Sequence, residues 1–257
     1  MKIIRDTNEK YHSHNSISAS GLKTIYKKSV YHLINQRFKE TPAMALGTAV
    51  HAAILESDDF YNQYHVIDKI DKRTKAGKEE YLKQVELSKN HNSCTQKIIL
   101  DYDNHEIIKN ILGAYRNHDL AQKYCQGEIE LSHYSQIDGV DVRVRPDCVN
   151  KISNFISDVK TCQDNSPEAF KRDVYKWGYH LQAAFYMDVL GIENFRFIAV
   201  TTSFPHTVEV YSLDEKTIEF GRNAWKQAFE NWKQYINTGI MPGYSWYQFE
   251  KDGSYVL

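Results

Sequence analysis

Cysteine, proline and long apolar runs are scarce in this chain. Its 257 residues include five prolines and four cysteines, and no apolar run approaches the roughly 18 residues that a membrane-spanning helix needs. The N-terminus lacks the apolar segment of a signal peptide. No pair of cysteines has Cys-x-x-Cys spacing, which argues against a zinc ribbon or an iron–sulfur cluster. We therefore expect a cytoplasmic protein with no membrane partner.

An excess of either charge is also missing. The formal net charge is −1, from 32 Lys and Arg against 33 Asp and Glu. A monomer that held nucleic acid mainly through phosphate contacts would usually be more basic. If the chain binds nucleic acid, its positive charge must be concentrated locally or brought together by oligomerisation.

Linkers rich in Pro, Gly or Ser are absent, and so are internal repeats. A chain of this length is by default one domain with a sizeable core. We expect a single domain over residues 1–257. Its parts are a helical N-terminal part at about 16–120, a core at about 126–237 and a tail at 238–257.

The order of predicted elements indicates an α/β fold with a central mixed β-sheet flanked by helices. A helix follows a cap at Ser18 or Ser20, and a buried, largely apolar helix runs over about Pro42–Leu55. Asp138 and Gly139 are typical of a type I′ hairpin. The other expected elements are strands at 60–68, 128–137, 140–147, 152–161, 195–202 and 207–212, and helices at 76–90, 101–117, 166–175, 177–190 and 214–237.

Asp147, Asp158 and Lys160 form the most informative pattern. Asp147 follows a proline, and Asp158 and Lys160 lie two positions apart on a predicted strand, so their side chains share one face. Two carboxylates and a lysine that converge at a strand pair can hold a divalent metal and steady a water. That chemistry hydrolyses phosphodiesters. The alternative is a salt bridge on a solvated face.

Two further residues are candidate metal ligands. His51 lies in the apolar helix, where Gly47 permits close helix–sheet packing and neutral imidazole is a good ligand, although it can also be a satisfied core histidine. Glu130 begins the hairpin strand whose return leads to Asp147, and it can bind a metal directly or through water. Glu128 has the same strand parity and can replace it. The alternative is an exposed edge glutamate.

Other polar groups show less specific patterns. Gln182 and Tyr186 share one helix face, where they can position a phosphate or the lysine, or be ordinary surface residues. The aromatic run from Trp177 to His180 can stack on a base or simply pack. Basic residues that can contact phosphates, or else belong to solvated loops, are Lys72, Arg73, Lys75, Arg143 and Arg145.

Together these segments resemble the PD-(D/E)XK nuclease superfamily in its RecB-like branch. More closely they resemble the catalytic domain of the RecE-type exonuclease (exonuclease VIII) of phages and prophages. Each motif alone is weak, and five in the right order are specific together. The ordered set is Gly47-Thr48-Ala49-Val50-His51, Glu130, Pro146-Asp147, Asp158-Val159-Lys160 and Gln182-x-x-x-Tyr186.

The resemblance implies one or two Mg²⁺ or Mn²⁺ ions per active site, with no iron–sulfur cluster and no ATP. It also implies that Asp147, Asp158 and Lys160 are catalytic, with Lys160 as the catalytic lysine, and that Gln182 and Tyr186 support them. The implied metal ligands are His51, Glu130, Asp147, Asp158 and the Val159 carbonyl.

The resemblance further implies the substrate and partners. Similar proteins degrade linear double-stranded DNA from 5′ ends in a bacterial host cell, leave a 3′ single strand, act with a single-strand annealing protein and form ring-shaped homo-oligomers. We therefore expect a Mg²⁺-dependent exodeoxyribonuclease. The competing hypotheses are a structure-specific endonuclease or flap nuclease of the same superfamily, and a catalytically idle DNA-binding recombination scaffold.

Overall fold

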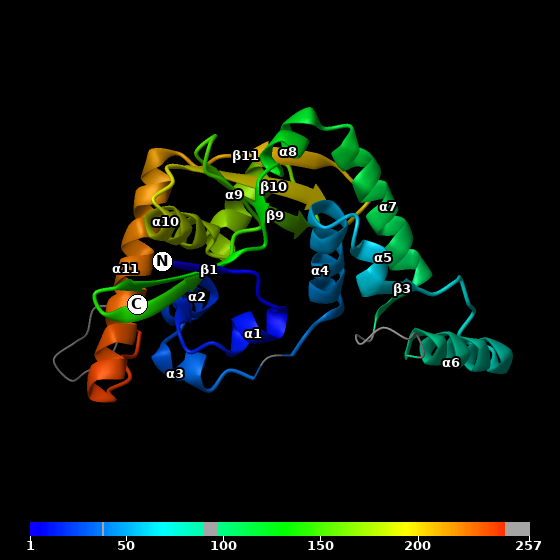
Figure 1. The fold of residues 1–257 in the computed structure, drawn as a ribbon, viewed down its shortest axis with the longest axis horizontal. Helices are drawn as coiled ribbons and strands as arrows, with labels where there is room; N and C mark the ends of the chain where they lie inside the picture. The colour runs from blue at the N-terminus through cyan, green and yellow to red at the C-terminus, as the bar shows by residue number, and fades with distance from the viewer. Residues whose placement is uncertain (38, 90–96, 245–257) are drawn as a thin grey trace.

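The computed structural model describes residues 1–37, 39–89 and 97–244 (Figure 1). Cys94 and the end of the expected tail, 245–257, lie outside the described residues. The strands are β1 (Lys2–Ile4), β2 (Ile17–Ser18), β3 (Tyr64–Val66), β4 (Ile98–Leu100), β5 (Glu128–Ile129), β6 (Ser132–Ile137), β7 (Val140–Val144), β8 (Cys148–Asn150), β9 (Phe155–Cys162), β10 (Asn194–Thr201) and β11 (Val208–Tyr211).

The helices begin where local signals place them. Ser18, one of the two predicted caps, accepts a hydrogen bond from the Gly21 amide at 3.3 Å, and Asp214 accepts one from the Thr217 amide at 2.7 Å. No described helix is long and apolar enough to cross a membrane. The helices are α1 (Asn8–Ser13), α2 (Ala19–Lys27), α3 (Val30–Ile34), α4 (Pro42–Leu55), α5 (Phe60–Gln63), α6 (Lys75–Lys89), α7 (Tyr102–Arg116), α8 (Asp119–Tyr124), α9 (Pro167–Lys176), α10 (Tyr179–Leu190) and α11 (Glu215–Thr238).

A five-stranded sheet of order β11-β10-β9-β8-β5 lies between two helical layers (Figure 1). β9 and β10 are parallel and the other pairs antiparallel, so the sheet is mixed. Alternate side chains of β10 enter different cores. Phe197 packs with residues of α2, α10 and α11, and Ile198 packs with residues of α4 and α7. The predicted α/β fold with a mixed sheet flanked by helices is confirmed.

The predicted strand at 128–137 is wrong as one strand, because it is broken at Glu130. Glu130 has φ 51°, in the left-handed region, where a residue cannot continue a strand ladder. β5 therefore joins the five-stranded sheet, while β6 and β7 join a second sheet of order β1-β6-β7-β2. The hairpin turn itself is confirmed, since Asp138 and Gly139 have φ 48° and 77°, as a type I′ turn requires.

The predicted strand at 60–68 is half wrong. Its first residues form the short helix α5, and only Tyr64–Val66 is extended, as the strand β3, which pairs with β4. Phe60 and Tyr64 are both buried and their rings stack at 4.8 Å between centroids. A spacing of four residues brings two rings together on a helical turn, and this contact prevails over the β propensity of the segment.

Helices α10 and α11 approach each other closely at Gly221. A Cβ placed there would lie 2.1 Å from the carbonyl oxygen of His180, which is backbone and cannot rotate away. We expect Gly221→Ala to lower the free energy of unfolding by about 3 kcal/mol, as overpacking does in a closed interface. Gly113→Ala on α7 is the matched control, because nothing lies within 4 Å of its Cβ position. Its higher helix propensity should add up to about 1 kcal/mol, and urea unfolding measures both effects.

Candidate active site

The strand β9 carries Asp158 and Lys160 on the sheet face that α10 covers. The Lys160 ammonium donates to Oδ1 of Asp158, so the predicted shared face is observed. The pair is not on a solvated face, because the side chain of Asp158 is only 3% exposed and that of Lys160 only 16%. Burial alone would lower the pKa of Lys160, but the Asp158 carboxylate more than offsets this effect and raises the pKa.

Asp147 lies directly before β8, the antiparallel neighbour of β9. Its Oδ2 accepts a hydrogen bond of 2.6 Å from the Val159 amide, which fixes the carboxylate against β9. The same oxygen lies 3.2 Å from Nε2 of His51. Burial would raise the pKa of Asp147, and the His51 charge lowers it; the net direction is down. The pKa of Asp158 is raised, first by burial and then by the Asp147 charge, so the environment moves the pKa values of the two acids in opposite directions.

His51 reaches the sheet from the middle of α4. Its Nε2 lies 2.7 Å from the Val159 carbonyl oxygen, and its Nδ1 lies 2.8 Å from the Gly47 carbonyl oxygen. A Cβ at Gly47 would lie 3.2 Å from Oγ1 of Thr161, so the expected close helix–sheet packing is present. Burial alone would lower the pKa of His51, but the Asp147 carboxylate raises it to about 9.

Gln182 and Tyr186 are buried residues of α10, not surface residues. Nε2 of Gln182 donates to Oδ2 of Asp158 at 2.6 Å, and Oε1 of Gln182 accepts from Lys23 at 3.0 Å. The Tyr186 hydroxyl donates to the Arg145 carbonyl oxygen at 3.4 Å. Gln182 therefore holds the acid of the Asp158–Lys160 pair, and Tyr186 holds the segment before Asp147.

The two candidate glutamates have different surroundings. Oε2 of Glu130 lies 3.1 Å from Nε of Arg145, and its backbone amide donates to the Asp147 carbonyl at 3.1 Å. Burial, and then the Asp147 charge, raise the pKa of Glu130 to about 8. Glu128 pairs with the exposed Lys151 at 2.9 Å instead. Glu130 thus lies on the side of Asp147 and His51, and Glu128 does not.

Arg143 is unsuited to the phosphate contacts predicted for it. Its guanidinium is buried, donates to the carbonyl oxygens of His14 and Ser16, and lies 5.1 Å from the Tyr11 ring. These bonds fasten the N-terminal segment to β7, so its role is structural. Arg145 differs, because it remains partly exposed and lines the cleft described below.

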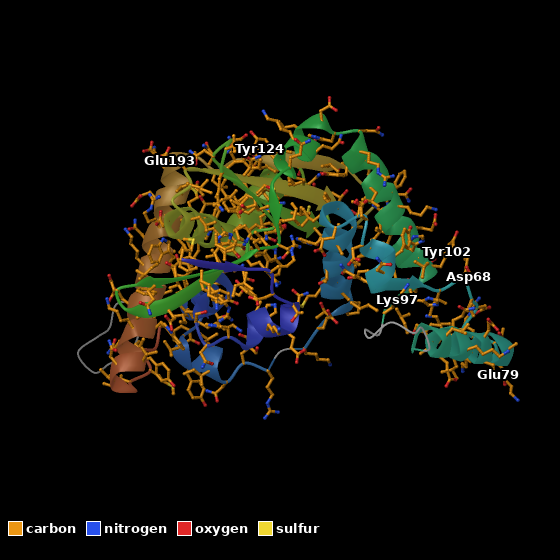
Figure 2. The ribbon with its side chains drawn as sticks, viewed as in Figure 1. Asp68, Glu79, Lys97, Tyr102, Tyr124 and Glu193 are labelled. Atoms are coloured by element: carbon orange, nitrogen blue, oxygen red, sulfur yellow. The ribbon has the colours of Figure 1, made fainter. Side chains whose placement is uncertain are left out.

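The predicted basic run lies away from this site. Lys75 is the first residue of α6, Lys72 and Arg73 directly precede this helix, and all three are exposed at the periphery of the molecule (Figure 1). Figure 2 shows Glu79 of α6 at the same outer edge of the molecule. The Arg73 guanidinium already pairs with Asp71 at 2.9 Å. The structure does not bring these three cations to Asp147 and Asp158.

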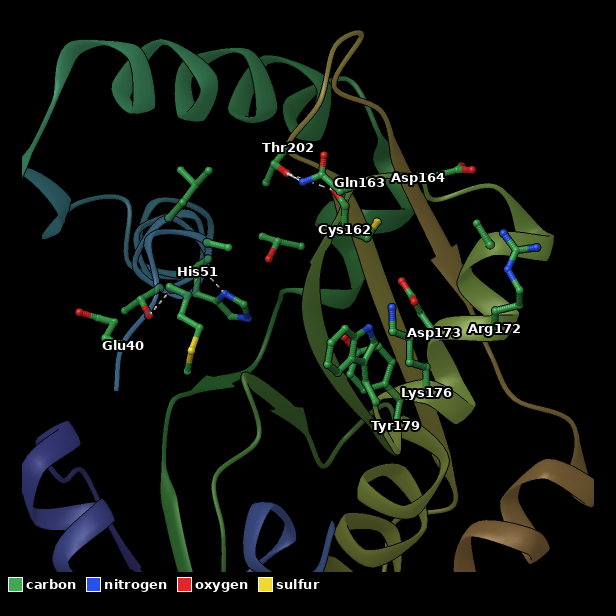
Figure 3. Close-up of a pocket in the computed structure, with 18 of the residues that line it drawn as sticks. Glu40, His51, Cys162, Gln163, Asp164, Arg172, Asp173, Lys176, Tyr179 and Thr202 are labelled. Atoms are coloured by element: carbon green, nitrogen blue, oxygen red, sulfur yellow. Dashed lines mark hydrogen bonds between the residues drawn. The ribbon is translucent and has the colours of Figure 1, made fainter. Parts of the chain in front are cut away.

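A cleft of about 1240 Å³ opens beside these residues. His51 of α4 lies on one wall, and Lys176 and Tyr179 lie on the other (Figure 3). Arg172 and Trp177 also line this second wall and are exposed. Of the aromatic run, Trp177 and Tyr179 line the cleft, whereas His180 is buried.

Sequence reasoning missed Lys23 and the cations of the second wall. Arg172 and Lys176 lie one helical turn apart on α9, but many solvated helices show this spacing. Lys23 is separated from Gln182 by 159 positions, and no local signal connects them. Burial, and then the Lys160 charge, lower the pKa of Lys23 to about 7.

The donor atoms here suit a divalent cation. Among the residues that the structure describes, no three His, Cys, Asp or Glu side chains are grouped closely enough to hold a metal alone. The Val159 carbonyl oxygen, however, joins Nε2 of His51 and Oδ2 of Asp147 as a third donor. Carboxylate and carbonyl oxygens completed by waters are what Mg²⁺ and Mn²⁺ prefer. Asp158 is the next carboxylate, and Lys160 and Gln182 now occupy its oxygens.

Comparisons with known proteins agree with this fold. A family model described as a PDDEXK-like domain of unknown function (DUF3799) matches residues 18–246. A crystal structure from Eubacterium rectale, of a protein provisionally assigned as an exonuclease, matches with a TM-score of 0.62 and 13% identity over 92% of this chain and 88% of that one. At such identity the likeness shows the fold alone.

A second solved structure is a phage-related exonuclease from Haemophilus somnus. It matches with a TM-score of 0.37 and 14% identity, over 91% of this chain and 100% of that one. No curated protein sequence matches this chain significantly.

Proposed function

This chain belongs to the family of PDDEXK-like domains of unknown function (DUF3799), and we propose that it is a metal-dependent exodeoxyribonuclease. The observation that carries the proposal is the convergence of Asp147, Asp158 and Lys160 beside a wide cleft, with His51 brought to the same place by α4. A salt bridge that served only stability would not need a second buried acid and an imidazole beside it.

Each residue has a distinct role in the proposed reaction. Asp147, His51 and the Val159 carbonyl would hold the metal, with Asp158 and Glu130 completing the set directly or through water. When bound, such an ion acts as a Lewis acid toward a phosphate oxygen and lowers the pKa of a coordinated water. The Lys160 ammonium orients the attacking water and stabilises the negative charge that develops on the phosphate.

We extend the proposal to the substrate and partners of the RecE-type exonucleases. The substrate is then a linear double-stranded DNA end, degraded 5′→3′ to leave a 3′ strand for a single-strand annealing protein. The motif resemblance supports this, and the exonuclease assignment of the Eubacterium rectale structure agrees with it. A ring of subunits is consistent with a net charge of −1, because a central channel can gather the local positive charge that the whole chain lacks.

End-labelled DNA tests the proposed function directly. Linear duplex labelled at either the 5′ or the 3′ end is digested with Mg²⁺ and with EDTA, beside a closed plasmid circle. We expect early, Mg²⁺-dependent release of the 5′ label as mononucleotide and no cutting of the circle. Internal cutting would favour the endonuclease, and tight binding without any cutting would favour the scaffold.

Metal binding should release a proton from His51. The pKa of about 9 means that His51 is protonated at pH 7 in the metal-free protein, and a ligand imidazole must be neutral. Raising the pH from 7 to 8 should therefore tighten Mn²⁺ binding about tenfold. Calorimetry in two buffers of different ionisation enthalpy measures the proton release. Binding that does not change with pH, or the same slope in His51→Ala, would remove His51 from the ligand set.

A further inference from the structure

We propose that Lys23 is a positioning residue of this site, which acts through Gln182 on the Asp158–Lys160 pair. The inference deepens the proposed nuclease function and rests on it. Lys23 comes from α2, near the N-terminus, and no motif of the sequence connects it with Asp147 or with Asp158 of β9.

A continuous chain of hydrogen bonds joins Lys23 to the site. Nζ of Lys23 donates to Oε1 of Gln182 at 3.0 Å, and Nε2 of Gln182 donates to Oδ2 of Asp158 at 2.6 Å. The other carboxylate oxygen, Oδ1, accepts from Lys160. Asp158 is thus held at both oxygens, once by the lysine beside it on β9 and once by an amide that Lys23 holds.

Lys23 helps to fix which end of the Gln182 amide faces Asp158. An amide side chain has an acceptor end and a donor end, and rotation by 180° exchanges them. The amine of Lys23 offers N–H donors in either protonation state, so it selects Oε1 of Gln182. Nε2 must then face Asp158, where it donates. Without Lys23, only the bond to Asp158 holds the amide, so the Gln182 side chain is less firmly positioned.

The surrounding packing keeps Lys23 in this place. Leu22 and Ile25, on the same helix, are buried in the core shared by α2, α10 and α11. Gly178 has φ 68°, and a Cβ there would lie 3.1 Å from Cδ of Lys23, so the turn before α10 lies directly on the lysine stem. Desolvating an amine with one amide partner costs folding energy. A role in the site accounts for its position better than stability does.

A double-mutant cycle tests the inference. Lys23→Met, Gln182→Met and the double variant are assayed on linear duplex DNA. We expect each single variant to lower kcat about tenfold to a hundredfold with little change in KM, and the double variant to be no slower than Gln182→Met alone. Lys27→Met is the matched control, because Lys27 is exposed one turn further along α2 and donates to the Lys176 carbonyl. It should keep wild-type kcat.

Two outcomes overturn the inference in an active enzyme. Wild-type kcat in Lys23→Met shows that the lysine is dispensable, and losses that multiply in the double variant show that it acts independently of Gln182. A purely structural lysine would lower the folded fraction and leave kcat per folded molecule unchanged, so circular dichroism accompanies each assay. If Lys23→Met does not fold, Lys23→Ala, whose smaller side chain lets water enter, takes its place in the cycle.

A second measurement separates this inference from the proposed function. If the wild-type protein cleaves no DNA, the nuclease proposal fails, and the geometry of Lys23 is then tested by NMR. The Gln182 side-chain amide protons, identified by their loss in Gln182→Met, should exchange slowly in the wild type and lose this protection in Lys23→Met. Unchanged protection would show that Lys23 does not hold the amide.

Discussion

Lys160→Ala is expected to lower the rate of DNA cleavage by about a thousandfold. The Lys160 ammonium is the cation held directly against Asp158, and its loss removes both the group that orients the water and the charge that offsets the developing phosphate charge. The fold should survive, because Asp158 keeps its bond from Gln182. Its pKa is already raised, so it can take up a proton rather than remain an unpaired buried charge.

The comparison that matters is with a lysine outside the site. Lys83→Ala on α6 removes an exposed lysine whose partner is Glu80 at 3.8 Å, and it should leave the cleavage rate unchanged. Binding of the labelled duplex in Ca²⁺ shows whether Lys160→Ala still engages DNA. Full cleavage by a folded Lys160→Ala protein would refute the proposed chemistry. Weaker DNA binding with an unchanged cleavage rate at saturating DNA would instead make Lys160 a substrate contact.

The strand pattern predicted this site better than it predicted the sheets around it. Alternation along a strand is a local property, so the shared face of Asp158 and Lys160 follows from their spacing alone. Which sheet a segment joins depends on where its strand is interrupted. Glu130 breaks it with φ 51° although it is neither glycine nor proline, and hydrophobic alternation gives no sign of such a residue. The hairpin was therefore recognised and its sheet was not.

The roles of individual cations depend on tertiary contacts in the same way. Arg143 and Arg145 are two residues apart and both contact the N-terminal segment, yet only Arg145 also pairs with Glu130 at the cleft. Charge patterning treats them alike, because it contains no information on which carbonyl groups a distant segment brings. Lys23 shows the converse, since only the packing of α2 on α10 places it beside Gln182.

Asp147→Asn is expected to abolish Mn²⁺ binding and to lower the cleavage rate by about a thousandfold. The substitution keeps the shape of the side chain and an acceptor for the Val159 amide, but it removes the charge that faces His51. Since that charge is what raises the pKa of His51, the pKa should fall toward its ordinary range. Calorimetry, the end-label assay and the titration of the His51 ring by NMR measure the three effects.

Glu128→Gln is the matched control, since it makes the same carboxyl-to-amide change two residues from Glu130. Glu128 pairs with the exposed Lys151, so its loss should change neither metal binding nor cleavage. Asp147→Asn should also cost about 1–3 kcal/mol of unfolding free energy, because one buried partner is no longer ideally paired. If Asp147→Asn lost stability but kept wild-type Mn²⁺ affinity and cleavage, Asp147 would be a purely structural acid. The metal would then have to be held elsewhere, and the contact between Asp147 and His51 would not be a metal site.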